Sequence, residues 1–317
     1  MKLSTRISRP LRPLLPLLAF CLSACSISTH PVRSTPTGQP VSLAAMEAAM
    51  AQPQTSAVQL QTIHSADWEV PLSGLLNLDH AAARQAGLQD KPEPIQVDLH
   101  VLVHPRYGAY LIDTGVSRAV LAQPEQAGFN RLLRSQMGLE KMHVRQSTAE
   151  VLQQLPSPLQ GVFLTHLHLD HIMGLKDLPL NLSLYTGKGE AGSRHWLHMF
   201  IQPAVDAQLQ GRPDLQEWPF AAQSDALFPG IVDVFGDASV FAISVPGHTP
   251  GSTAYLVRSS SGNVLITGDA CHTRWGWEHG VEPGSYTRDH DSNLRYLLAL
   301  KALAQRHPDL QVRLGHQ

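Results

Sequence analysis

Cysteine is scarce in this chain, with three residues among 317. Cys21 and Cys25 lie near the N-terminus and Cys271 is distant from both, so a scaffold built on internal disulfides is excluded. Basic residues form no run beyond the first dozen positions, which excludes the electrostatic footprint of a nucleic-acid groove. No apolar stretch approaches the roughly 20 residues that cross a bilayer. The hydrophobic content of 43% nevertheless suffices for a large folded core.

The first 25 residues predict a signal peptide. Residues 1–13 contain four basic residues and no acidic residue, and an apolar run from Leu14 to Leu22 follows. This is the order of a charged n-region and a short h-region. The sequence Leu22-Ser-Ala-Cys25 resembles a bacterial lipobox, in which Cys25 is acylated and becomes the new N-terminus. The alternative is an ordinary secretory signal with a chance cysteine.

This N-terminal pattern predicts an exported, periplasmic protein that lipid on Cys25 holds to a bacterial membrane, and Ser26 favours the outer membrane. Removal of residues 1–25 lowers the formal charge from −2 to −6, which further disfavours nucleic acid as a partner. Residues 26–58 begin with a stretch rich in Ser, Thr and Pro that has neither helical nor strand period. We therefore expect a flexible tether over 26–58 and one folded domain over 59–317.

Short apolar runs of strand length recur through the predicted domain, and helical patterns interrupt them. The expected strands are 95–103, 109–112, 161–164, 240–245, 254–257, 264–267 and 311–314. The expected helices are 147–155, a segment starting near residue 171, 189–200 and 292–306. This order predicts a mixed α/β domain.

The most informative stretch is Thr165-His-Leu-His-Leu-Asp-His171, which directly follows one of the expected strands. His166 and His168 are two positions apart, so in an extended segment both imidazoles project to one side and are able to bind one metal ion. Asp170 and His171 then point in other directions as the chain enters a helix, and they suit a second metal nearby.

Three further expected strands end in a candidate ligand. His248 lies in Pro246-Gly-His-Thr-Pro-Gly251, Asp269 ends Thr267-Gly-Asp, and His316 follows Gly315. A single histidine after a strand is a weak signal, because most such residues are hydrogen-bonded bystanders. Four strand ends that together carry seven candidate ligands are a much stronger one.

In these motifs the sequence resembles the metallo-beta-lactamase fold hydrolases, and within them the binuclear-zinc, lactonase-like branch. The resemblance covers residues 59–317 and implies an αββα sandwich, in which two mixed β-sheets are flanked by helices. It assigns one metal to His166, His168 and His248, the other to Asp170, His171 and His316, and it makes Asp269 the carboxylate that bridges both. Zinc is expected for both ions, and iron or manganese suits the same mixture of ligands.

The resemblance also implies a mechanism in which a hydroxide between two metals attacks a carbonyl, so that no Ser or Cys nucleophile is required. Asp170 is then the carboxylate best placed to pass a proton to the leaving oxygen. Leu111-Ile-Asp113-Thr-Gly115 matches an early strand and turn of the family and suggests that Asp113 supports a ligand. Equally open is that Asp113 only forms a turn and does not contact the site.

Among related hydrolases, the lactonase-like branch fits best. True beta-lactamases generally have Cys or Ser where this chain has Asp269, and thioesterases of the glyoxalase II type append a substrate domain after the last ligand. One departure from the lactonases is His272, which stands where they carry a tyrosine three residues after the bridging aspartate. His272 either donates the same hydrogen bond to substrate or is a partner of Asp269.

The expected substrate is a small ester or lactone, most of all an acyl-homoserine lactone. Trp275 and Trp277 follow Asp269 closely in the sequence and are predicted to contact the substrate. For Trp196, Met199 and Phe200, ordinary packing is the simpler interpretation. Two alternatives stay open. One is a hydrolase of the same fold that acts on another ester, a thioester or a beta-lactam, and the other is a lipid-anchored protein that binds metal without turnover.

Overall fold

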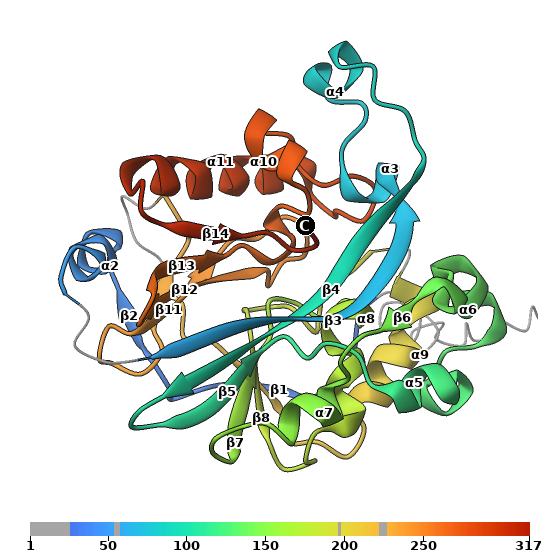
Figure 1. Cartoon of the computed structure of the whole chain (residues 1–317), viewed down its shortest axis with the longest axis horizontal. Helices are drawn as coiled ribbons and strands as arrows, with labels where there is room; N and C mark the ends of the chain where they lie inside the picture. Colours follow the sequence, from blue (N-terminus) through green and yellow to red (C-terminus); the bar gives the residue numbers. More distant parts are fainter. Residues whose placement is uncertain (1–25, 54–57, 196–197, 222–226) are drawn as a thin grey trace, which may run out of the picture.

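The computed structural model describes residues 26–53, 58–195, 198–221 and 227–317 (Figure 1). The predicted signal peptide, including Cys25, and also Trp196 lie outside these residues. Within the described part of the chain, no helix combines the length and the hydrophobicity that crossing a membrane needs.

The described residues form two mixed β-sheets. The first has eight strands in the spatial order β1 (Val32–Ser34), β9 (Leu215–Glu217), β8 (Ser183–Thr186), β7 (Leu159–Phe163), β5 (Gly108–Ile112), β4 (Pro92–His104), β3 (Gln59–Pro71) and β6 (His143–Val144). The second has six, in the order β14 (Gln311–Arg313), β13 (Gly262–Ile266), β12 (Thr253–Ser259), β11 (Val240–Ser244), β10 (Ile231–Asp233) and β2 (Gln39–Val41). Each contains parallel and antiparallel pairs.

Helices lie on the outer faces of the two sheets (Figure 1). The α-helices of the described residues are α2 (Leu43–Met50), α3 (Leu72–Leu75), α4 (Ala81–Gln85), α5 (Arg118–Ala122), α6 (Arg131–Met137), α7 (Thr148–Leu152), α8 (Leu169–Ile172), α9 (His198–Leu209), α10 (Arg274–His279) and α11 (His290–Arg306). Short 3-10 helices are η1 (Pro124–Ala127), η2 (Leu139–Lys141), η3 (Met173–Asp177) and η4 (Gly268–Ala270). The αββα sandwich that the sequence implied is therefore present.

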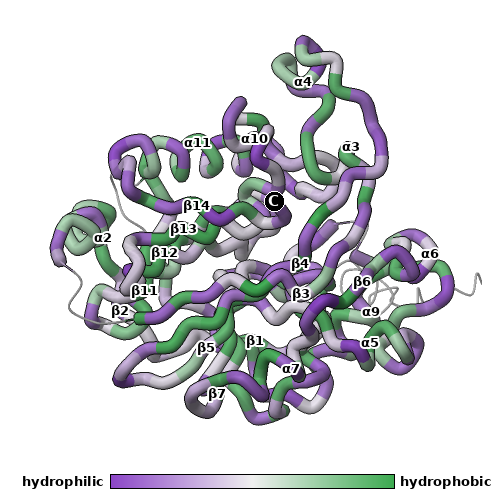
Figure 2. The backbone as a smooth tube through the Cα atoms, in the orientation of Figure 1, coloured by the Kyte–Doolittle hydropathy of each residue, from purple (hydrophilic) through white to green (hydrophobic). Residues whose placement is uncertain are grey.

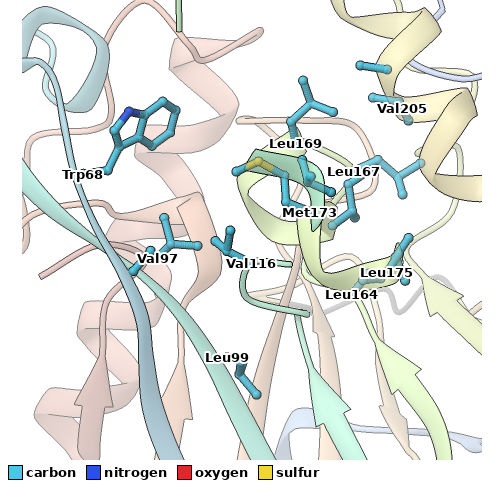
Figure 3. Close-up of a cluster of buried hydrophobic side chains, with 14 of the residues drawn as sticks. Trp68, Val97, Leu99, Val116, Leu164, Leu167, Leu169, Met173, Leu175 and Val205 are labelled. Atoms are coloured by element: carbon cyan, nitrogen blue, oxygen red, sulfur yellow. The ribbon is translucent and has the colours of Figure 1, made fainter. Parts of the chain in front are cut away.

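Apolar side chains fill three layers between these elements. Phe163, Trp218 and Tyr255 meet between the two sheets, and α11 packs on the outer face of the second sheet through residues such as Leu300. Figure 3 shows the largest cluster, where α8 and its neighbours face the first sheet. In the first half of β4, apolar and polar positions alternate (Figure 2). Burial on both faces explains why the central strands read as continuous apolar runs.

The first described residues correct the predicted tether over 26–58. Ile27 is completely buried, β1 pairs with β9 in the first sheet, and β2 pairs with β10 in the second. Ser42 caps α2 by accepting a hydrogen bond from Ala45 N. Strands of three residues at a sheet edge tolerate proline and polar side chains, so a composition typical of linkers here belongs to edge strands that join both sheets.

One predicted helix is displaced. The segment expected over 189–200 forms turns first, and α9 begins only at His198 and runs to Leu209. Gly189 adopts a φ of +79°, which a helix does not permit. This shift brings α9 against α8 and so places it beside the predicted ligands.

Candidate metal centre

The motif from His166 to His171 lies where β7 ends. Two hydrogen bonds from the second sheet fix this strand end: Tyr255 Oη donates to Leu164 O at 2.9 Å, and Thr253 N donates to Thr165 O at 2.9 Å. The backbone is extended at His168 and then turns into α8, which carries Asp170 and His171. The four side chains therefore leave the backbone in two directions, as the spacing predicted.

The remaining predicted ligands come from the second sheet. His248 follows β11, Asp269 lies in η4 directly after β13, and His316 follows β14. Gly315 passes so close to Asp269 that a Cβ atom at this position would clash with Oδ1 of the carboxylate. The absence of a side chain at 315 thus permits the last strand to present His316 beside Asp269.

The structure brings all seven predicted ligands into two groups that share Asp269. In each group the ligand atoms lie within 4.8 Å of one another. The first group contains His166, His168, His248 and Asp269, and the second contains Asp170, His171, Asp269 and His316.

The distances within the two groups are those of ligands around a common centre. Asp269 Oδ2 lies 3.5 Å from His166 Nε2, 3.3 Å from His171 Nε2 and 3.4 Å from His248 Nε2. In the second group, Asp170 Oδ2 lies 3.3 Å from His316 Nε2. A carboxylate between histidines at these separations has the arrangement of a bridging ligand.

Unsatisfied buried atoms show that these residues fit metal ions. His166 Nε2, His171 Nε2 and Asp269 Oδ1 are buried and have no hydrogen-bond partner among the described residues. Buried polar atoms without a partner are costly, and these three converge on the two groups. Imidazole nitrogens with carboxylate oxygens form a donor set that zinc, iron or manganese accepts.

The electrostatics divide the histidines into two classes. Burial, together with the neighbouring histidines, holds the pKa of His166 and of His248 well below the usual range, and burial lowers the pKa of His168 to about 4. These three rings are neutral and offer lone pairs, which is the form that binds metal.

The other two histidines face more carboxylates. Burial opposes protonation of His171 and His316, but nearby Asp269 and Asp170 outweigh it, so the pKa of His171 is well above its usual value and that of His316 rises to about 10. The surrounding histidines in turn overcome burial and hold the pKa of Asp269 far below normal. The second group therefore concentrates negative charge, which favours a bound cation.

Asp113 contacts a predicted ligand directly. Its Oδ2 accepts a hydrogen bond from His171 Nδ1 at 2.8 Å, and both carboxylate oxygens accept from Thr165, through the backbone N–H and the hydroxyl. This contact excludes the interpretation of Asp113 as an isolated turn residue. With Nδ1–H engaged, Nε2 of His171 is left to face Asp269.

Backbone and hydroxyl groups orient two other histidines in the same way. His316 Nδ1 donates to Gln96 O at 2.9 Å, and His248 Nδ1 lies 3.2 Å from Thr287 Oγ1. Neither partner carries a sequence signal, because Gln96 lies on β4 and Thr287 on the loop before α11, far along the chain from the histidines that they orient.

Sequence reasoning also missed Glu190, a completely buried carboxylate. Glu190 Oε1 accepts from Leu167 N at 2.9 Å, and Oε2 accepts from Thr249 Oγ1 at 2.6 Å and from Gly251 N at 2.9 Å. It thereby joins the loop that carries His166 and His168 to the loop that carries His248.

Replacing Glu190 with glutamine is expected to weaken metal binding by about 10–100-fold, the usual effect of losing a group that supports metal ligands. The NH₂ group of the glutamine would face at least one of the three groups that donate to Glu190, so at least one hydrogen bond between the two loops would be lost. Competition with a chromophoric chelator measures the affinity. Glu140→Gln, at an exposed position, is the matched control, and equal affinities in the two variants would contradict the expectation.

His272 has one nitrogen fixed by the backbone. Its Nδ1 lies 3.1 Å from Leu75 O, which only accepts, so Nδ1 carries a proton. Nε2 lies 3.0 Å from Asp269 Oδ2. Both ring nitrogens thus face groups of the protein, so this geometry favours the interpretation of His272 as a partner of Asp269 over that of a donor to substrate.

A cavity of about 690 Å³ opens onto the two groups. Its lining includes His168, Asp170, His248, Asp269, His272 and His316. Its walls are largely apolar and come from β3, β4, α6, α9 and the loop before α11; among them are Trp68, Ile95, Leu133, Met137, Phe200, Ile201 and Tyr286.

The structure corrects the prediction that Trp275 and Trp277 contact substrate. Among the described residues, neither belongs to the lining of the cavity. Trp275 stacks on His279 at a ring-centre distance of 4.1 Å, and Trp277 packs into the core beneath α11. Closeness to Asp269 in sequence therefore did not determine which groups the two rings contact. Cys271 is a buried free thiol, and Sγ donates to Thr273 O at 3.4 Å.

The family model of the metallo-beta-lactamase superfamily matches residues 100–316. The chain belongs to the metallo-beta-lactamase superfamily. Within this superfamily, it is 31% identical over 164 residues to "N-acyl homoserine lactonase AttM" of Agrobacterium fabrum, which covers 51% of this chain and 59% of that protein. The chain therefore aligns with somewhat over half the length of this relative. The protein of the same name from Rhizobium johnstonii is 29% identical over 67% of this chain and 78% of its own length.

Solved structures of the superfamily show the same fold. A "Quorum-Quenching N-Acyl Homoserine Lactone Lactonase" superposes with a TM-score of 0.57 at 18% identity, and covers 84% of this chain and 94% of its own. "AidC, a Dizinc Quorum-Quenching Lactonase" gives 0.51 at 16% identity, with coverage of 88% and 90%.

Proposed function

We propose that this protein is a metal-dependent hydrolase that opens the ester bond of a lactone bearing an acyl chain, in the manner of N-acyl homoserine lactones. The observation that carries the proposal is that the two metal-binding groups open onto a largely apolar cavity of about 690 Å³, which five of their seven side chains line. A polar reaction centre next to an apolar chamber suits a polar head group with a hydrocarbon tail. The likeness to the AttM lactonases supports this substrate class.

Two bound divalent metals would supply a hydroxide nucleophile near neutral pH and polarise the substrate carbonyl. The chain provides the rest. Asp113, Gln96 O and Thr287 fix the ligand histidines, and the apolar walls exclude water from the acyl chain. Asp170, whose side chain is 17% exposed and lines the cavity, is the carboxylate that substrate reaches. We assign to it the transfer of a proton to the leaving oxygen.

We assign His272 to the support of Asp269, and a pair of substitutions tests this role. In His272→Asn the amide nitrogen replaces Nδ1 and keeps the bond to Leu75 O, but the group facing Asp269 is lost. In His272→Gln the amide occupies the position of Nε2. We expect the asparagine variant to lose about 10–100-fold in metal affinity and the glutamine variant to lose less. Unchanged metal affinity in both, with reduced kcat, would instead indicate a donor to substrate.

The test of the proposed function is metal content by elemental analysis together with a hydrolysis panel. The panel contains acyl-homoserine lactones of several chain lengths, aryl esters, a thioester and a cephalosporin. We expect two metals per chain and turnover of the lactones. Turnover confined to the thioester or the cephalosporin would assign that substrate class in place of lactones. Bound metal without any turnover would favour a metal-binding protein that is not an enzyme.

We further propose that residues 1–25 direct export and that Cys25 carries lipid. The basic and apolar order of these residues and the lipobox-like sequence support this. Cell fractionation of the full chain and of Cys25→Ser tests it. The wild-type chain is expected in the membrane fraction and the variant in the soluble periplasm; identical distributions would contradict lipidation.

A further inference from the structure

The described chain begins firmly attached to the segment that leads into α9. Ile27 N donates to Ser193 O at 2.8 Å, and Ser28 N donates to Ala191 O at 3.2 Å. The hydroxyl of Ser28 also donates to Asp206 on α9 at 2.5 Å. Ile27 and Ser28 are therefore fixed to the folded domain by hydrogen bonds.

The same segment forms one side of the cavity. Ser26 forms an isolated β-bridge with Arg194, and Gln202 Nε2 donates to Ser26 O at 2.8 Å. The sequence neighbours of these two residues, His195 and Ile201, line the cavity. Ser26, where the described residues begin, therefore lies beside the cavity.

Exposed apolar side chains gather at this place. Of the seven large hydrophobic residues exposed in the described part of the chain, four belong here, namely Leu132 (58%), Met199 (48%), Phe200 (45%) and Tyr286 (39%). Leu132, Phe200 and Tyr286 also line the cavity, so they stand at its opening. We call these four residues the rim. Soluble surfaces seldom collect large apolar side chains in this way unless something covers them.

Exposed arginines accompany the rim on each of its segments. Arg131 precedes Leu132, Arg194 precedes α9, and Arg288 lies two residues after Tyr286 and itself lines the cavity. Apolar and aromatic side chains interspersed with arginine are suited to the head-group region of a bilayer, where guanidinium groups meet phosphates.

We propose that the rim rests on a lipid bilayer, so that the cavity opens toward the membrane. The lipobox-like sequence Leu22-Ser-Ala-Cys25 directly upstream of Ser26 identifies the occupant, because the acylated Cys25 proposed above would attach to the fold beside the cavity. A lipid on Cys25 would lie one residue from Ser26 and would hold the rim against the surface.

This orientation has a consequence for substrate, and that part rests on the proposed function. Each methylene of an acyl chain favours transfer from water into lipid, so long-chain lactones concentrate in the bilayer. The rim would take such a substrate directly from the membrane, with the acyl chain entering along the apolar walls.

A position-specific fluorophore on the full, processed chain tests the orientation. Met199→Cys and Leu180→Cys are each labelled with an environment-sensitive dye; Cys271, which is 1% exposed, does not react, and mass spectrometry verifies one dye per chain. Leu180 is the matched control because it is 58% exposed but precedes β8, at the end of that strand opposite the metal centre. Vesicles of phosphatidylethanolamine with phosphatidylglycerol are compared with phosphatidylcholine alone.

We expect a blue shift and a several-fold rise in emission at position 199 on addition of vesicles, quenched by brominated lipid, and no change at 180. The anionic vesicles should give the stronger response. No change at 199, or equal changes at both positions, would overturn the proposal. A concentration-dependent shift at 199 without vesicles would assign the rim to a second copy of the chain instead.

Kinetics test the substrate route separately. For one long-chain lactone, the ratio of the rate on vesicle-borne substrate to the rate on dissolved substrate is expected to fall several-fold in Met199→Asp and to keep the wild-type value in Leu180→Asp. Equal ratios would overturn the route. Complete absence of lactone turnover in the wild-type chain would overturn the proposed function and this route with it, whereas the fluorescence decides the orientation independently.

Discussion

Replacing Asp269 with asparagine is expected to lower the metal content from two ions to fewer than one and to reduce turnover by about three orders of magnitude. Asp269 is the residue that both ligand groups share, and its side chain is only 4% exposed. Asparagine keeps the shape of the side chain but removes the negative charge that would offset the positive charge of the bound metal ions. Elemental analysis and kcat/KM on the best substrate of the panel measure the two effects.

Asp98→Asn is the matched control for this change. Asp98 is also a largely buried aspartate near the second group, but its carboxylate pairs with His64 at 2.8 Å and belongs to neither group. We expect the control to keep both metals. An Asp269→Asn protein that retained two metals and near wild-type turnover would refute the assignment of a bridging carboxylate.

Replacing Asp170 with asparagine is expected to preserve the fold and to reduce turnover of a lactone by about 10²–10⁴-fold, the range for loss of a general acid or base. Asp170 and Asp269 both line the cavity, but the side chain of Asp170 is 17% exposed and that of Asp269 only 4%. The neighbouring histidines overcome burial and keep the pKa of Asp170 low, so in the described arrangement this carboxylate is an acceptor that is able to relay a proton.

A leaving-group series separates proton transfer from metal binding in this variant. Esters of acidic phenols need little protonation as they leave, so Asp170→Asn should affect them far less than lactones or alkyl esters. Metal content is measured on the same samples. Equal losses across the series would indicate a purely structural or ligand role, and near wild-type activity on lactones with full metal content would refute the assignment.

The sequence predicted the grouping of the seven side chains because the segments that carry them each follow an apolar strand. Such a strand is identified from its own residues, and its end sets the place of the next side chain. His166, His248, Asp269 and His316 are all specified locally in this way. What local patterns do not contain is the identity of partners such as Glu190 or Gln96, which only the assembled sheets bring within hydrogen-bond distance.

The largest omission among the strands was β3, the Gln59–Pro71 strand. The pairing of β3 with β4 shifts between His64 and Ala66, so its apolar alternation changes face part-way along and no single period fits. Trp68 lies beyond this bulge and lines the cavity. Because this bulge prevented the prediction of β3, the contribution of β3 to the cavity wall was not predicted either. Trp275 and Trp277, which do not line the cavity, were predicted to contact substrate instead.

Because the ligands are divided between the two sheets, both sheets must fold and dock before the protein is able to bind metal. His166 to His171 follow β7 of the first sheet, while His248, Asp269 and His316 follow strands of the second. A partly folded chain therefore offers only fragments of either group, and contacts between residues so distant in sequence form late and slowly. In refolding experiments, backbone structure should form before metal is taken up, so the rate of maturation is set by the docking of the two sheets and not by the supply of metal.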